Sequence, residues 1–393
     1  MTLVSPDGAF GGPIRVALNQ AAELRRRGHD VHLAAGWRGE GSPPSALDGI
    51  PAKLFPAFRL IRPMGFSGMV SPGLALWVLR NIGDYDIVHV HAGRDLISTT
   101  SMALAWVRRG RYVTQTHGMV QPDERLRAKI MDAAAVRGLL RAAGTRFVLT
   151  KHEEDGLVQV LGSSTTCEQL PNGVPAQPDF PDAVEDGGEV LFCARLHERK
   201  RPIAFVGMAA ELLRRGLIAK FAMIGPDEGE LAAVRDSISK RGLEKHVRYE
   251  GALNYDAVPG RMRQAAVYVL PSMHEPFPMS MLEALALGIP SVCTDTCDIA
   301  APLREYGAAV VTDGSVTALA DAVQVILTDD ALRSELSRNA RKVVAELFSM
   351  NAVGNRLERT YQSVVTRAWP ISGGAPPGRH LPSTTASVDD VIA

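Results

Sequence analysis

The chain has 393 residues, which is too long for one compact core, so we expect two domains. Basic and acidic residues both number 43, so the formal net charge is zero and the charge balance does not favour a nucleic-acid partner. The four cysteines are too few and too irregularly spaced for a disulfide framework. This cysteine usage predicts a reducing, cytoplasmic setting. No signal peptide is visible, and since no apolar run reaches 18 residues we expect no membrane span.

The first half of the chain alternates short apolar runs with helical patterns. A strand at residues 3–5 precedes Gly8, Gly11 and Gly12, which we expect to form a flexible loop. A helix then begins at Pro13, where a missing N–H costs nothing, and ends in a cationic turn before Gly28. Further buried strands are expected at residues 31–35, 86–91, 112–116 and 146–150. This order predicts a parallel, doubly wound α/β domain over residues 1–175.

The second half repeats the same architecture. The segment from Asn172 to Gly188 is rich in proline, glycine and acidic residues, and we place an interdomain linker at 176–188. Strands are then expected at 189–194, 221–225, 246–250, 267–270, 291–293 and 308–311, with helices at 202–215, 228–241, 281–287, 316–327 and 331–347. This predicts a second doubly wound domain over 189–347. A further helix lies within 348–368, and the Pro/Gly/Ser/Thr-rich tail at 369–393 is expected to be disordered.

Two glutamates follow the expected strand at 267–270. Glu275 and Glu283 are separated by seven residues, in a loop that turns into a helix. Ligands of open α/β sheets bind at the carboxyl ends of the strands, and a carboxylate has two acceptor oxygens that suit a vicinal diol. Ser280 and Glu283 also fit a capping box at a helix start, and Glu275 also fits a solvated loop, so both interpretations stay open.

Two cations follow the expected strand at 189–194. Fixed charges on Arg195 and Lys200 would stabilise a leaving diphosphate, although clusters of this kind are more often basic surface loops. The glycine loop at 8–12 could let backbone N–H groups approach phosphate or sugar oxygens, or could simply be a tight turn.

Histidines follow two strands of the first half. His117 follows the strand at 112–116 and is either part of a site or a structural hydrogen-bonding residue. His91 is a secondary candidate, and His89 is interpreted as structural. The Asp84–Asp86 segment has the D-x-D form of metal-dependent transferases, but it precedes a strand at the end away from the expected cleft. We therefore interpret it as a turn and expect no catalytic metal.

These segments together resemble the retaining glycosyltransferases of the GT-B fold, family 4 type (glycosyl transferases group 1), in which two Rossmann-like domains face a central cleft. The E-x7-E pattern of Glu275 and Glu283 and the R-L-x-x-x-K pattern from Arg195 to Lys200 carry the resemblance over residues 189–300. It is looser over 1–175 and absent from the tail.

The resemblance implies a role for each candidate residue. Glu275 would contact hydroxyls of the donor sugar and Glu283 the ribose, while Arg195 and Lys200 would hold the diphosphate. The loop containing Gly11 and Gly12 would reach across the cleft to the donor, and His117 would lie near the transferred sugar.

The resemblance further implies retaining hexosyl transfer from a nucleotide-diphosphate sugar, with no cofactor and no metal. The leaving phosphate takes the acceptor's proton, and no carboxylate nucleophile is identifiable in the N-terminal half. This chain departs from the family at Pro278, where glycine is usual. Because proline has no N–H, a donor contact made there is lost or supplied by Met279.

The acceptor stays open among saccharide, lipid-linked and small-molecule hydroxyls. A mixed basic and apolar segment could contact an anionic membrane peripherally, or could be a solvated helix face; its members are Arg125, Arg127, Lys129, Ile130, Met131, Arg137, Leu139, Leu140 and Arg141. Two other functions also stay open: a sugar-nucleotide epimerase of the same fold, and a non-catalytic subunit that binds a nucleotide.

Overall fold

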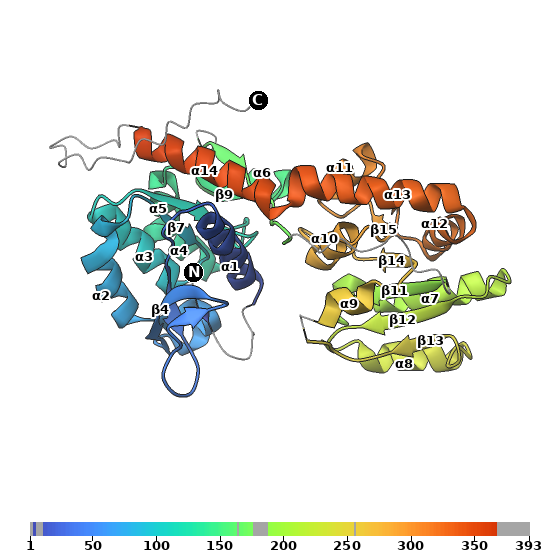
Figure 1. The fold of residues 1–393 in the computed structure, drawn as a ribbon. Helices are drawn as coiled ribbons and strands as arrows, with labels where there is room; N and C mark the ends of the chain where they lie inside the picture. Colours follow the sequence, from blue (N-terminus) through green and yellow to red (C-terminus); the bar gives the residue numbers. More distant parts are fainter. Residues whose placement is uncertain (1–2, 5–10, 163–164, 176–187, 255–256, 368–393) are drawn as a thin grey trace, which may run out of the picture.

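The computed structural model describes residues 3–4, 11–162, 165–175, 188–254 and 257–367. Two α/β bodies lie side by side, and the long C-terminal helix runs back from the second to the first (Figure 1). Gly8, most of the expected linker and the expected disordered tail lie outside the described residues.

The N-terminal body contains two four-stranded sheets with hydrogen-bonded orders β1-β2-β4-β3 and β10-β9-β8-β7. Its elements are β1 (Leu3–Val4), α1 (Gly11–Arg26), β2 (Leu33–Trp37), β3 (Ala46–Leu47), β4 (Ile50–Pro56), β5 (Phe58–Arg59), η1 (Arg62–Gly68), β6 (Met69–Val70), α2 (Pro72–Asn81), η2 (Ile82–Asp84), β7 (Val88–His91), α3 (Leu96–Val107), β8 (Tyr112–Gln115), α4 (Leu126–Met131), η3 (Asp132–Val136), α5 (Arg137–Ala142), β9 (Arg146–Val148), α6 (Lys151–Leu161) and β10 (Cys167–Gln169).

One expectation for this body was wrong. Gly11 and Gly12 were expected in a loop but form the first two residues of α1, so the helix starts before Pro13. Within the described residues the strands of this body form two sheets, in which β1 pairs parallel with β2 and β3 pairs antiparallel with β4.

The C-terminal body has one six-stranded parallel sheet in the order β13-β12-β11-β14-β15-β16. Its elements are β11 (Glu189–Cys193), η4 (Glu198–Lys200), α7 (Pro202–Arg214), β12 (Lys220–Ile224), α8 (Leu231–Lys240), β13 (Val247–Tyr249), α9 (Val258–Met262), β14 (Val267–Leu270), α10 (Met279–Ala286), β15 (Ser291–Thr294), α11 (Ala300–Glu305), β16 (Val310–Thr312), α12 (Val316–Thr328), α13 (Asp330–Val343) and η6 (Val344–Phe348). The strand order reverses between β11 and β14, which is where ligands bind in such sheets.

Both faces of this sheet are buried, as in other parallel sheets. Along β11, Leu191 packs into the cluster under α10, whereas Val190 and Phe192 pack into the cluster under α7 and α12. The continuous apolar sequence of these strands follows from this two-sided burial.

The last helix, α14 (Met350–Thr366), packs on α1 of the N-terminal body (Figure 1). Ser349 caps it by accepting a hydrogen bond from the Ala352 N–H at 3.1 Å. The segment at Val174 and the segment at the start of α14 are hydrogen-bonded to each other here. The Val174 N–H donates to Phe348 O, and the Met350 N–H donates to Val174 O.

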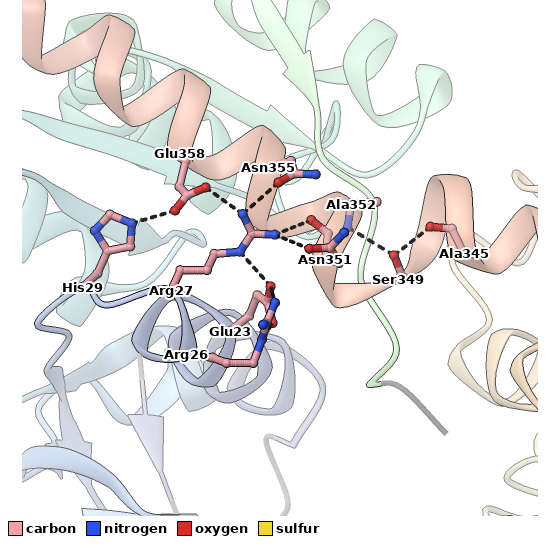
Figure 2. Close-up of polar contacts among 10 residues, drawn as sticks. All are labelled: Glu23, Arg26, Arg27, His29, Ala345, Ser349, Asn351, Ala352, Asn355 and Glu358. Atoms are coloured by element: carbon pink, nitrogen blue, oxygen red, sulfur yellow. Dashed lines mark hydrogen bonds and ion pairs between the residues drawn. The ribbon is translucent and has the colours of Figure 1, made fainter. Parts of the chain in front are cut away.

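Arg27 at the end of α1 holds α14 in place (Figure 2). Its guanidinium donates to Glu23, Asn355 and Glu358, each at 2.7 Å, and to the backbone and side chain of Asn351. A single, mostly buried cation thus joins the two helices.

The expected basic and apolar membrane segment is not assembled as one surface. Leu139 and Leu140 are buried in the N-terminal core, and Arg137 and Arg141 donate to the carbonyls of Val160 and Leu161 at the end of α6. This part of the expectation was wrong because helix α5 turns its leucines inward. No helix in the described ranges is both long and apolar enough to cross a membrane.

Candidate functional site

The loops after β11 and β14 meet at the reversal of strand order. Lys200 ends η4, and its Nζ lies 2.5 Å from Oε2 of Glu275, with 11% and 6% of the two side chains exposed. Burial lowers the pKa of the Lys200 ammonium, and the neighbouring Glu275 opposes that shift. The structure therefore joins two of the predicted site residues in a nearly water-free ion pair.

Backbone strain accompanies this pair on both loops. Arg201 and His274, the neighbours of Lys200 and Glu275, both have left-handed backbone, with φ of 52° and 49°. Such conformations are costly for residues other than glycine and are often found at functional sites. Arg201 also donates to the carbonyls of Pro271 and Gly314, which ties the loop after β11 to the loops after β14 and β16.

Arg195 is placed at the same strand end but does not contact Glu275. Its guanidinium donates to Glu228 Oε1 at 2.7 Å, and its side chain is 53% exposed. The loop after β11 thus offers a buried cation at Lys200 and exposed cations at Arg195 and Arg199, and the Arg199 guanidinium lies 3.9 Å from Glu275.

Helix α10 begins at Met279, shortly after Glu275 in the sequence, and Pro278 is its N-cap residue. Ser280 therefore lies inside the helix, and its hydroxyl bonds that of Tyr268 at 2.8 Å. The alternative of a capping box between Ser280 and Glu283 was wrong, because the helix starts too early for Ser280 to cap it. Glu283 is half-buried in the middle of α10. Burial raises the pKa values of Tyr268 and Cys193, and the charge of Glu283 raises them further.

The N-terminal body presents His117 on a tight turn after β8. His117 has a left-handed backbone with φ of 51°. The residues on either side of it are bound by one carboxylate: Glu153 Oε1 accepts from Thr116 Oγ1 and from the Gly118 N–H, each at 2.5 Å. Glu153 Oε2 accepts from the Leu149 N–H at 2.7 Å. Glu153 therefore fixes the backbone that carries His117.

The His117 ring contacts a second histidine. His91 Nδ1 lies 2.7 Å from His117 Nε2, and His91 also lies parallel to His89 on the same face of β7. Burial lowers the pKa of His117 to about 3 and that of His91 well below its ordinary value. Both imidazoles are therefore neutral at pH 7.

A hydrogen bond joins the two bodies beside Glu275. Thr150, the N-cap of α6, donates through Oγ1 to Asp298 Oδ2 at 2.9 Å, and the Asp298 N–H donates to the Glu275 carbonyl at 3.0 Å. Because Glu153 lies in the first turn of the same helix α6, the His117 turn and the Glu275 loop are held at one interdomain junction.

Two residues that organise this junction were absent from the predicted site. Glu153 and Arg201 stand in charged segments of the sequence, and neither has a local signal that separates it from surface charge. Only the long-range contacts of their side chains distinguish them, so the tertiary structure was the missing information.

The remaining predicted positions are more peripheral. Gly12 has no neighbour within 4 Å of an added Cβ, which leaves its backbone openly accessible at the start of α1. Asp84 ends η2, ahead of β7. No group of three or more His, Cys, Asp and Glu side chains in the described part of the chain could hold a metal ion.

Comparison with known families matches both halves of the chain. The family described as "Glycosyltransferase Family 4" matches residues 10–177, and the family described as "Glycosyl transferases group 1" matches residues 175–343. The two matches follow one another and together span both bodies.

Individual relatives agree with these matches. The phosphatidyl-myo-inositol mannosyltransferase of Mycobacterium leprae is 25% identical over 91% of this chain and 94% of its own length. The alpha-D-kanosaminyltransferase of Streptomyces kanamyceticus is 28% identical over 46% of this chain, and the match spans less than half, 47%, of that protein.

Solved structures share the fold. The Anabaena protein HepE, solved with UDP, superposes with a TM-score of 0.71 and 17% identity over 92% of this chain and 99% of its own. Sucrose-phosphate synthase from Thermosynechococcus elongatus superposes with a TM-score of 0.68 and 18% identity over 90% and 94% of the two chains. The fold is GT-B, and the chain belongs to the group 1 glycosyltransferases of the family 4 type.

Proposed function

We propose that this protein is a retaining hexosyltransferase that moves a sugar from a nucleotide-diphosphate sugar to an acceptor hydroxyl without a cofactor or metal. The observation that carries the proposal is the buried pair of Lys200 and Glu275 at the reversal of strand order, on the same interdomain junction as the His117 turn. Membership of the family and the fold shared with a UDP-bound protein support it.

In this proposal the C-terminal body binds the donor. Glu283 accepts from the ribose hydroxyls, and Glu275 accepts from hydroxyls of the sugar. Lys200, and Arg195 after it leaves Glu228, face the diphosphate. Their positive charge stabilises the negative charge that develops as the diphosphate leaves. The backbone of Gly11, Gly12 and Met279 is proposed to contact the donor from the two helix starts.

The transfer step is proposed to occur on one face of the sugar. The acceptor oxygen forms a bond with the anomeric carbon as the bond from that carbon to the diphosphate oxygen breaks, and the acceptor's proton passes to the departing diphosphate. His117 is proposed to contact the transferred sugar by a hydrogen bond. Its ring is partly buried, and its lowered pKa leaves it neutral at pH 7.

For the acceptor we propose a hydroxyl of a saccharide, a lipid-linked glycan or a small polar molecule. One relative is named a phosphatidyl-myo-inositol mannosyltransferase, and that name supports a lipid-linked hydroxyl among these acceptors. A cytoplasmic location is proposed with it, and peripheral membrane contact is retained only for the exposed Leu126, Arg127 and Ile130 on α4.

One observation favours a second candidate, a non-catalytic subunit that binds a nucleotide. Pro278 is the N-cap of α10 and has no N–H, so the start of this helix offers one donor fewer than a glycine would. Nucleotide binding without turnover in any acceptor mixture would favour this candidate.

The test is thermal stabilisation by a panel of nucleoside diphosphates and sugar nucleotides, in the absence of metal. A ligand at 100 times its Kd stabilises the folded state by about 2.7 kcal/mol, so the true donor raises Tm. Glu283→Ala and Lys200→Ala should abolish the rise, whereas Lys220→Ala, an exposed lysine of β12, should keep it.

Each protein is compared with its own unliganded Tm, because Lys200→Ala removes the nearest cation from the buried Glu275, leaves Arg199 at 3.9 Å, and lowers the baseline Tm. If no nucleotide stabilises the folded native protein, the donor site is wrong. Selective stabilisation by one nucleotide names the base for acceptor screens.

A further inference from the structure

A column of side chains leads from the crossing helix α14 to His117. The hydroxyl of Tyr361 on α14 lies 2.7 Å from His89 Nδ1. The His89 ring lies parallel to that of His91, with centroids 4.7 Å apart and planes at 12°. His91 in turn bonds His117. The two β7 histidines share a face because side chains alternate along a strand.

The contact between His91 and His117 is an in-plane hydrogen bond. The ring planes differ by only 8°, the centroids are 4.9 Å apart and the two nitrogens are 2.7 Å apart. Since a ring nitrogen sits on the rim of its ring, this combination requires both nitrogens to lie close to the line between the ring centres. That line then lies in both ring planes, which is the direction of the nitrogen lone pair and of the N–H bond.

This geometry restricts the proton of His117. A neutral imidazole has one N–H donor and one acceptor nitrogen, and one of the two facing nitrogens must be the donor. If His91 donates, His117 carries its proton on Nδ1; if His117 donates, its Nδ1 is an acceptor. Either way, the role of Nδ1 is decided by the partner of Nε2.

We propose that His91 is a positioning residue that sets the tautomer and ring orientation of His117. The consequence for turnover rests on the proposed function, in which His117 meets the transferred sugar. Glu153 fixes the backbone of the turn, and His91 fixes the ring. The His89 ring packs against the face of the His91 ring, and Tyr361 bonds His89.

Two substitutions of His91 distinguish the effect of its ring from the effect of its hydrogen bond to His117. His91→Phe keeps a flat ring against His89 and loses the bond to His117. His91→Asn loses the ring but keeps a polar atom near the position of Nδ1. His91→Leu is the reserve variant if the phenylalanine protein does not fold.

The first readout does not depend on activity. In protein labelled with nitrogen-15 histidine, two-bond proton–nitrogen correlations distinguish the tautomers of neutral imidazoles. The chain has 10 histidines, and His117→Gln identifies the signals of His117 by their loss. We expect one tautomer of His117 in the native protein and in His91→Asn, and a mixed or switched tautomer in His91→Phe. An unchanged His117 spectrum in His91→Phe overturns the positioning role, whether or not the protein transfers sugar.

The second readout is turnover with the donor found by thermal stabilisation. We expect His91→Phe to lower kcat about 10-fold or more, with the KM for the donor within about 3-fold of native, and His91→Asn to recover most of the loss. A changed tautomer with native kcat overturns the role of His91 in turnover. If the native protein transfers no sugar at all, the proposed function fails, and the spectrum still decides whether His91 positions His117.

Discussion

Glu153 is a buried carboxylate that accepts hydrogen bonds from three donors. Its side chain is 3% exposed, and its oxygens accept from the Thr116 hydroxyl and from the N–H groups of Gly118 and Leu149. Burial raises the pKa of Glu153, and these hydrogen bonds oppose the shift. Because the Glu153 carboxyl accepts each of these hydrogen bonds, it fits the ionised form, whose two oxygens are acceptors and carry no donor.

Glu153→Gln should therefore destabilise the protein although it preserves size. The new side-chain NH2 group would face the Leu149 N–H, so two buried donors would lie opposite each other without an acceptor. We expect this to lower the free energy of unfolding by about 1–3 kcal/mol. Urea denaturation at pH 7 measures the effect. Glu154→Gln is the matched control, because the neighbouring Glu154 is paired with Lys151, an exposed residue, and should change stability by less than about 1 kcal/mol. Equal effects in the two variants would contradict the anchoring role of Glu153.

At the scale of elements, β7 brings protonatable side chains into the core. His89 and His91 come from its Val-His-Val-His sequence, and His117 follows the adjacent β8. Burial lowers the pKa of His89 and of His117 to about 3. Because an unfolded histidine titrates near pH 6.5, the unfolded chain binds more protons than the folded one between these values, and stability falls as pH falls through this window.

Each such histidine should contribute about 1.4 kcal/mol of lost stability per pH unit below about pH 6.5. Urea denaturation at pH 7.5, 6.5 and 5.5 gives the slope. His89→Gln should reduce it, whereas His152→Gln removes an exposed histidine and should leave it unchanged. The same slope in both variants would show that His89 is protonated as easily in the folded protein as in the unfolded chain.

The elements also show where the sequence was sufficient. Strand-like runs predicted every strand of the six-stranded sheet. In β11, β12 and β14 the run is mainly apolar because both faces are buried, whereas the edge strand β13 contains the exposed Arg248. Strand β4 was missed because Pro51 and Pro56 interrupt its apolar pattern, and proline is a poor signal for a strand. The early start of α1 was missed because Gly11 and Gly12 are typical of a loop.

At the scale of the whole molecule, the attachment of α14 decides how the two bodies are held. Arg27 is 12% exposed and bonds Glu23, which is 7% exposed, together with Glu358 and two asparagines of α14 (Figure 2). His29 adds a bond to Glu358 at 2.8 Å. Removing the guanidinium would leave the buried Glu23 without its most buried partner.

Arg27→Ala should lower the free energy of unfolding by about 3 kcal/mol, because it breaks a mostly buried charge network. Arg26→Ala is the matched control, since Arg26 binds the same Glu23 from a side chain that is 63% exposed, and it should cost less than about 1 kcal/mol. Limited proteolysis should also cleave the Arg27 variant faster near α14. If both variants unfold at the native urea concentration, α14 is held by its apolar contacts alone.

The sequence by itself determined the two doubly wound halves, the positions of the E-x7-E and R-L-x-x-x-K segments at strand ends, and the resemblance to the family. These properties depend on periodicity and on motifs, which are local in the chain. The tertiary structure decided that Lys200 pairs with Glu275 across 75 residues, that Thr150 meets Asp298 across 148, and that His91 bonds His117. Such pairs leave no periodic signal, because the distance between two side chains depends on how whole strands are ordered and how two bodies pack.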